Sequence, residues 1–319
     1  MAAEEVLVVG GGIAGVACAR VLHDAGVRVR VRDRGRRLGG RMAVRTVDDR
    51  PVDVGAAYFT ADSPAFTQVV ESWVAAGLAR PWTDTFHVAT PDDGITGTVT
   101  GPVRYATPGG LRSLVEQLAA GLDVTYADHV ESVTAGPLVD GEPYAAVALA
   151  MPAPQADDLL PAAIAEEAPT APRLWEPALS LVTLWDERVW PALDGVFVHD
   201  SPVLTWVADD GSRRGDGAAV LVAHSDPVLA AAHLDDPAAA VPAMLDELRR
   251  TLRIDAVPSG HFVKRWSLAK PVDVVSMPFH LGPARVGRCG DGWHGRSRIE
   301  SAYLSGSALG RGLRTLLGA

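Results

Sequence analysis

The sequence contains little cysteine and almost no lysine. Its two cysteines, Cys18 and Cys289, form no C-x-x-C motif and permit at most one disulfide, so a reducing compartment is expected. Lys264 and Lys270 are the only lysines, and arginine supplies the other basic residues. Acidic residues outnumber basic ones, and the net charge of −10 argues against nucleic acid as the main partner.

Features of membrane, exported and metal-binding proteins are also lacking. No apolar run is long enough to span a bilayer, and Glu4 and Glu5 stand where a signal peptide would be basic. We therefore expect a cytoplasmic protein. The nine histidines do not have metal-ligand spacing, and neither H-E-x-x-H nor G-x-S-x-G occurs. No metal is expected.

The N-terminal residues predict a β-α-β unit. Val6 to Val9 form a short apolar run, which is typical of a buried parallel strand. Ile13 to Asp24 is rich in alanine and valine and favours a helix, with Gly26 as a suitable C-terminal cap. Val27 to Asp33 then alternates apolar and charged residues, the pattern of a strand with one exposed face.

A glycine motif, G-x-G-x-x-G, connects the first strand to this helix. Gly10 permits a tight turn, Gly12 lets a pyrophosphate approach the backbone, and Gly15 lets helix and strand pack closely. The free N–H groups near Ile13 and Ala14 would face the phosphates. A glycine-rich turn without a ligand is the alternative, and the complete strand–helix–acid context argues against it.

The residues after the second strand indicate which dinucleotide binds. Asp33 would accept hydrogen bonds from the adenosine ribose, which favours FAD or NAD over NADP. The basic, glycine-rich loop that follows suits FAD better than NAD, because FAD needs further contacts along its pyrophosphate and ribityl chain. Arg41 could donate charge-assisted hydrogen bonds there, with Arg34, Gly40 and Met42 beside it. A solvated basic loop is the alternative interpretation.

Later segments predict further elements of the same kind. Leu111 to Ala119 has the apolar spacing of an amphipathic helix. Tyr144 to Met151 is an apolar strand stopped by prolines. Near the C-terminus, Ala284 to Cys289 indicates a short strand and Ile299 to Leu317 a helix.

The segment between these elements differs in character. From Pro152 to Pro177 the composition shifts to alanine, proline and acidic residues, as in a connection between layers or domains. Four strand-like runs follow, separated by turn residues such as Asp209-Asp210-Gly211, and they favour an antiparallel sheet. Ala239 to Leu252 favours a helix. The four runs are Leu179–Trp185, Val196–His199, Val203–Ala208 and Ala218–His224.

Together these elements predict an α/β fold with two domains. We expect a discontinuous Rossmann-type FAD-binding domain over 1–60, 101–155 and 281–319. A substrate domain with a mixed or antiparallel sheet is expected over 61–100 and 156–280. The flavin should lie where the two domains meet.

Several motifs resemble the flavin amine oxidase superfamily, and within it the renalase-like branch. The superfamily motifs are the N-terminal glycine motif with Asp33, then Leu38–Met42, Asp53–Phe59, Gly290–Trp293 and Arg298–Gly306. The renalase-like features are the short chain and the segments Met151–Gln155, Leu204–Asp210 and Lys264–Trp266.

The resemblance implies a role for each matching position. FAD would bind non-covalently, with Arg41 near its pyrophosphate, the Val130 backbone at the adenine and Asp291 at a ribityl hydroxyl. A helix N-terminus would stabilise the negative N1–O2 edge of the reduced ring. The other implied cofactor contacts are Gly55, Ala56, Ala57 and Tyr58 beside the isoalloxazine, Arg298, Ile299 and Glu300 at that helix start, and Met151 and Gly290.

The substrate site is less clearly marked. Tryptophan-rich strands could form a flat wall over the flavin, although such tryptophans more often lie in a core and a lone histidine is more often structural. We cannot assign the lysine that amine oxidases place near flavin N5, because Lys264 could face away. No catalytic residue is assigned. The substrate-binding candidates are Tyr58, Trp206, His224 and Trp266.

The resemblance implies an oxidase that accepts a hydride on flavin N5 from an isomeric dihydro-NAD(P). Dioxygen would reoxidise the flavin and give hydrogen peroxide. Hydride transfer needs mainly positioning, which suits a sequence without an obvious acid or base. An amine oxidase or flavin desaturase is the second hypothesis, and a non-catalytic flavin-binding protein is the third.

Overall fold

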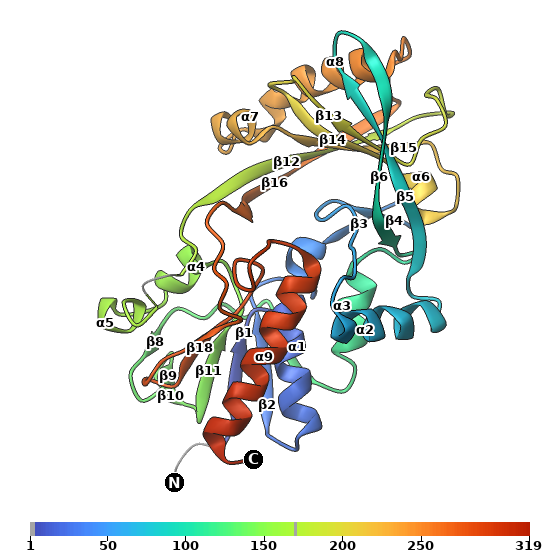
Figure 1. Ribbon diagram of the computed structural model, residues 1–319. Helices are drawn as coiled ribbons and strands as arrows, with labels where there is room; N and C mark the ends of the chain where they lie inside the picture. Colours follow the sequence, from blue (N-terminus) through green and yellow to red (C-terminus); the bar gives the residue numbers. More distant parts are fainter. Residues whose placement is uncertain (1–3, 169–170) are drawn as a thin grey trace. The chain divides into compact units, whose positions relative to one another are not determined.

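The computed structural model describes residues 4–168 and 171–319, which fall into two compact units (Figure 1). The first unit comprises Met1–Met42, Leu114–Trp175 and Lys270–Ala319, and the second comprises Ala43–Ser113 and Glu176–Ala269. Residues 169 and 170, within the expected connection from Pro152 to Pro177, lie outside the described residues. The expected domain ranges place 43–60 and 101–113 with the N-terminal segment, whereas contacts group them with the second unit.

The first unit contains a six-stranded sheet in the order β17-β18-β11-β1-β2-β7. All neighbouring strands are parallel except β17 and β18. The strands are β1 (Val6–Val9), β2 (Val29–Asp33), β7 (Asp123–Tyr126), β11 (Ala146–Leu149), β17 (His280–Leu281) and β18 (Val286–Arg288). β1 and β11 are buried at every residue, as their continuous apolar sequences predict. The carboxyl ends of β1, β2, β11 and β18 therefore share one edge.

Two helices of the first unit, α1 (Ile13–Asp24) and α9 (Ile299–Leu317), run side by side (Figure 1). A Cβ on Gly306 would overlap the Ala14 carbonyl, and one on Gly310 would lie 2.8 Å from the Cys18 carbonyl oxygen. Moving four residues along α9, from Gly306 to Gly310, corresponds to moving four residues along α1, from Ala14 to Cys18, so the two helices run parallel. At the level of Ala14, α1 has run one residue from its start at Ile13, whereas α9 has run seven from its start at Ile299. The first residue of α9 therefore lies about six residues, or about 9 Å, further toward the N-terminal side than the first residue of α1.

The second unit is built on a seven-stranded mixed sheet in the order β16-β12-β15-β14-β13-β5-β6. β13 and β5 are parallel, whereas β12–β15, β15–β14, β14–β13 and β5–β6 are antiparallel pairs. Helix α8 (Val241–Leu252) buries Met244 and Leu248 in the core with strand residues of this sheet. The strands are β5 (Arg80–Thr90), β6 (Gly94–Ala106), β12 (Trp175–Leu184), β13 (Gly195–Val198), β14 (Leu204–Asp209), β15 (Val220–Ser225) and β16 (Gly260–Pro271).

Shorter elements connect these layers. The helical ones are η1 (Gly40–Met42), α2 (Pro64–Ala75), α3 (Arg112–Leu118), α4 (Ala153–Asp157), α5 (Ala162–Ala165), α6 (Asp210–Arg214), α7 (Pro227–Ala232) and η2 (Pro237–Ala240). The extended ones are β3 (Val44–Val47), β4 (Arg50–Asp53), β8 (Val133–Thr134), β9 (Leu138–Val139) and β10 (Glu142–Pro143).

The mixed α/β architecture confirms the expected fold class, and α1 and α9 begin and end where the sequence predicts. The turn expected at Asp209-Asp210-Gly211 is wrong, because α6 begins at Asp210. Asp209 caps this helix by accepting a hydrogen bond from the Ser212 backbone N–H at 2.8 Å.

We expect Gly306→Ala to destabilise the protein although alanine is the better helix former. The new methyl group would overlap the Ala14 carbonyl, and overpacking of this kind costs about 1–3 kcal/mol. The same change in an open helix position stabilises by roughly 0.5–1 kcal/mol, so the sign is diagnostic. Urea unfolding measures it, with Arg311→Ala on the exposed face of α9 as the control. A variant as stable as the wild type would show that the helices are farther apart.

Candidate functional site

The glycine motif lies at the shared carboxyl edge of the first unit's sheet. Gly10 has φ +110°, and a Cβ there would lie 2.6 Å from the Ala150 carbonyl oxygen. A Cβ on Gly15 would overlap the Gly10 carbonyl. Gly12 differs, because a Cβ there would meet nothing within 4 Å. Gly10 and Gly15 are thus required by packing, and Gly12 faces open space at the start of α1.

Two helices, α1 and α9, begin near this edge, and neither has a side chain that caps its N-terminus. Their N-cap residues are Gly12 and Arg298. Such a helix end attracts negative charge through its free N–H groups and its dipole. The two helix starts are staggered by about 9 Å along the axis. An elongated ligand with two electronegative groups could therefore place one group at each helix N-terminus.

Asp33 at the end of β2 joins two loops of the site. One carboxylate oxygen accepts a hydrogen bond from the Gly11 N–H at 2.5 Å, and the other accepts one from the Gly35 N–H at 2.6 Å. Each oxygen has a second lone pair. Asp33 can therefore hold the glycine motif in place and still accept a hydrogen bond from a ribose hydroxyl.

Arg41 and Asp291 bind each other in the first unit. Arg41 donates two hydrogen bonds to Asp291, at 2.8 and 2.5 Å, and its guanidinium lies 5.0 Å from the Trp175 ring centroid. Ser297 also donates to Asp291, at 2.7 Å. The pair joins η1 to the loop between β18 and α9. Sequence reasoning found both charged residues but missed Ser297 and Trp175, which no motif marks.

The remaining candidates of the first unit lie around these groups. A Cβ on Gly40 would lie 3.5 Å from the Gly12 Cα, which puts the basic loop beside the glycine motif. Glu300 is buried and pairs with Arg298 at 3.2 Å, and the Gly290 N–H donates to Ser305. The other candidates range from buried to exposed: Ile13, Ala14, Met42, Val130 and Ile299 are buried, Met151 packs at the edge of the core, and Arg34 is exposed.

The candidate segment Gly55–Tyr58 belongs to the second unit, where side chains hold its backbone carbonyls. Arg213 donates to the carbonyls of Ala57 at 2.9 Å and Asp53 at 3.3 Å. Trp266 donates its indole N–H to the Val54 carbonyl at 2.7 Å, and His224 hydrogen-bonds the Gly55 backbone. Ala56, within this segment, is half-buried. Two residues expected at the substrate therefore contact the backbone instead: His224 at Gly55, and Trp266 at Val54 just before the segment.

Arg213 belongs to a buried ionic cluster that sequence reasoning missed. Arg213 and Arg214 on α6 pair with Asp210 and Asp53, and Arg50 pairs with Asp210 at 2.6 Å. Burial alone would raise the pKa of Asp210, but the three arginines outweigh burial and the pKa is lowered. Asp210 therefore stays ionised and neutralises the arginines around it. With its charge neutralised, Arg213 can be buried and donate hydrogen bonds to the 53–57 backbone. The sequence feature that could have indicated this cluster is D-D-G-S-R-R at 209–214, which places acidic and basic residues three and four positions apart.

Tyr58 and Trp206 lie in an aromatic cluster with Phe86. The ring centroids of Tyr58 and Trp206 are 5.7 Å apart, and Phe86 lies 5.3 Å from Tyr58 and 4.5 Å from Trp206. Trp206 is 6% exposed, whereas Tyr58 is half-buried. The structure brings these two candidates together, and Tyr58 has the more accessible face.

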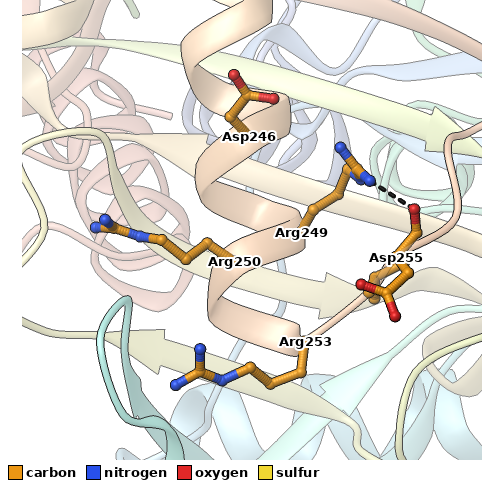
Figure 2. Close-up of a pocket in the computed structure, with 6 residues that line it drawn as sticks. Asp246, Arg249, Arg250, Arg253 and Asp255 are labelled. Atoms are coloured by element: carbon orange, nitrogen blue, oxygen red, sulfur yellow. Dashed lines mark hydrogen bonds between the residues drawn. The ribbon is translucent and has the colours of Figure 1, made fainter.

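A surface hollow of about 380 Å³ lies elsewhere, at the C-terminus of α8 (Figure 2). Its arginines are already engaged: Arg249 donates to the Asp255 and Ala256 carbonyls, Arg253 to the Asp92 carbonyl, and Arg250 pairs with Glu247. These contacts complement the negative end of the helix. The hollow contains no candidate residue. Over residues 4–168 and 171–319, no helix could cross a membrane and no cluster of His, Cys, Asp and Glu could hold a metal.

Comparisons with known proteins agree with this architecture. Residues 8–73 match the NAD(P)-binding Rossmann-like domain family. The flavin-containing amine oxidase B of Sus scrofa is 47% identical over 55 residues, and that of Mus musculus 46% over 56 residues. Each match covers 17% of this chain and 11% of the amine oxidase.

Structural similarity extends over the whole chain. A protein assigned as a protoporphyrinogen oxidase from Exiguobacterium sp. 255-15 has a TM-score of 0.76 and 14% identity, covering 99% of this chain and 100% of that one. Putrescine oxidase bound to putrescine has a TM-score of 0.73 and 13% identity, covering 98% and 99%. These identities show a shared fold. The expected resemblance to flavin amine oxidases is thus confirmed for the fold and the N-terminal segment, and the renalase-like branch stays a prediction.

We expect His224 to make the protein less stable in mild acid. Burial and nearby Arg213 lower its pKa to about 4, although the Gly55 backbone favours the charged form. In the unfolded chain a histidine takes up its proton near pH 6.5. The folded state therefore loses stability as the pH falls from about 6.5 to about 4, and the loss stops below that. His224→Gln should remove this part of the pH dependence.

Unfolding free energies of the wild type and His224→Gln between pH 7 and pH 4 measure the effect. His261→Gln, on an exposed strand position, is the matched control. Parallel pH profiles for His224→Gln and the wild type would show that this histidine is solvated in the folded protein.

Proposed function

We propose that this protein is an FAD-dependent oxidoreductase that accepts a hydride from an isomeric dihydro-NAD(P). The observation that carries the proposal is the open space that Gly12 leaves at the start of α1, with the start of the parallel helix α9 about 9 Å away along the helix axis. FAD would supply the hydride acceptor at its N5, and dioxygen would reoxidise it with release of hydrogen peroxide.

The chemistry of the first unit's residues fits such a group. Gly12 leaves backbone N–H groups of α1 accessible to a pyrophosphate, and Asp33 has lone pairs for the ribose hydroxyls. Arg41 would compensate the phosphate charge, and Asp291 would accept a ribityl hydroxyl. The N-terminus of α9 would stabilise the negative edge of the reduced ring.

Amine oxidation is the second candidate, and one observation favours it. Lys264 lies with its ammonium 5.1 Å from the Trp266 ring centroid, and Trp266 donates to Val54. Lys264 is thus on the same side of β16 as Trp266, which holds the Val54 carbonyl just before the Gly55–Tyr58 segment. The similarity to flavin-containing amine oxidase B also supports this candidate.

We expect Arg41→Ala to weaken FAD binding far more than Arg36→Ala. Arg36 is exposed, whereas Arg41 would contact the pyrophosphate. A charge-assisted hydrogen bond contributes roughly 1.5–3 kcal/mol, so the FAD dissociation constant should rise about 10- to 150-fold. Titration of apoprotein with FAD measures it. Because Arg41 also pairs with Asp291, circular dichroism of the apoprotein must show an intact fold. Equal constants for the two variants would contradict the assignment.

Anaerobic mixing with candidate donors tests the function. The purified protein should be yellow and release FAD rather than FMN on denaturation. Isomers of NAD(P)H reduced at position 2 or 6 should bleach the flavin faster than NADH or simple amines do. Faster bleaching by a primary amine or polyamine would favour amine oxidation. Bleaching by chemical reductants alone would favour a non-catalytic flavin-binding protein, and colourless protein that cannot be reconstituted would refute the cofactor.

A further inference from the structure

Arg104 on β6 is a buried cation whose charge is not compensated within the part of the chain that the structure describes. It is 6% exposed. Its guanidinium donates one hydrogen bond, at 2.5 Å, to the Asp84 carbonyl. Across residues 4–168 and 171–319 it has no carboxylate within ion-pair distance. A buried charge without a counterion is costly, which points to a role beyond packing.

The surroundings of Arg104 are aromatic. Its guanidinium carbon lies 4.0 Å from the Phe86 ring centroid and 5.7 Å from that of Tyr58. Trp206 packs on both of these rings, and its indole N–H is buried without a hydrogen-bond acceptor among the described residues. Cation–π contacts offset part of the burial cost of Arg104. The cluster still holds two donors, on Arg104 and Trp206, that lack a negatively charged acceptor.

Two other buried arginines of the same unit have carboxylate partners. Arg213 and Arg214 pair with Asp210 and Asp53, so their charges are neutralised locally. Arg104 is buried to a similar extent but has aromatic neighbours in place of acids. The contrast indicates that its counterion comes with a ligand.

We propose that Arg104 binds an oxyanion, a carboxylate or phosphate, of the substrate whose planar ring packs on Tyr58. The inference rests on the proposed function, since it names a chemical class for the substrate of that enzyme. Tyr58, Trp82 and Phe197 have partly exposed side chains in this cluster and offer aromatic surface to a ring. The guanidinium would attract an anionic donor such as a dinucleotide and repel an ammonium group. Arg104 would thus select against amines.

Binding of small planar probes to the FAD-loaded protein tests the proposal without turnover. The probes are nicotinate, its neutral analogue nicotinamide, and benzylamine, which carries an ammonium group. Quenching of tryptophan fluorescence reports binding because Trp82 and Trp206 lie in the cluster. Nicotinate should bind at least tenfold more tightly than nicotinamide, and benzylamine most weakly. Nicotinamide mononucleotide distinguishes a phosphate from a carboxylate: tighter binding than nicotinamide assigns the site to phosphate, and either preference supports the proposal.

Arg104→Gln should abolish the preference for the anionic probes. The matched control is Arg45→Gln, which removes an exposed arginine 4.2 Å from the Phe262 ring centroid and should change nothing. Arg104→Lys keeps the positive charge and should retain a preference for anions, which covers the case in which the glutamine variant does not fold. Equal affinities for nicotinate, nicotinamide mononucleotide and nicotinamide, or a preference that survives in Arg104→Gln, would overturn the proposal. Failure of every donor to bleach the flavin refutes the enzyme function separately.

Discussion

The contact between α1 and α9 governs what the first unit can present to a ligand. Gly306 and Gly310 have no side chains, so the backbone of α9 rests directly on the carbonyls of Ala14 and Cys18. Both helices start from the carboxyl edge of one parallel sheet, and their contact sets how far apart they start. The ion pair between Arg41 and Asp291 then ties the loops at that edge together. A methyl group in the wrong place on α9 would disturb all of these features.

The second unit meets a different constraint, because it must order the irregular segment that follows β4. It does so through Arg213 and Trp266, whose side chains donate hydrogen bonds to backbone carbonyls of residues 53–57. Arg213 can serve in this way because Asp210 neutralises it within a buried ionic cluster. Ion pairing with carboxylates thus fixes the position of Arg213. Arg104 differs because it is buried without a carboxylate partner among the residues that the structure describes.

Local patterns predicted most elements of the first unit. Apolar runs became β1 and β11, alternation became β2, and the helices α1 and α9 follow from apolar periodicity between clear boundaries. The hairpin of β5 and β6 gave no such signal, because it is largely half-exposed and contains threonine and glycine where a buried strand would be apolar. The D-D-G sequence at the start of α6 predicts a turn, because Asp and Gly favour turns; here the Asp209 N-cap and ion pairs stabilise a helix instead.

Residue types alone therefore determined a dinucleotide-binding β-α-β unit, its glycine motif and the acid at the end of β2, because these depend on contacts between residues close in sequence. Only the tertiary structure decided that Arg41 meets Asp291, that Arg213 and Trp266 hold the 53–57 backbone, and that Arg104 is buried among aromatic rings. Each of these contacts joins residues from different elements, and no periodicity or spacing encodes which side chains a folded sheet and its loops bring together.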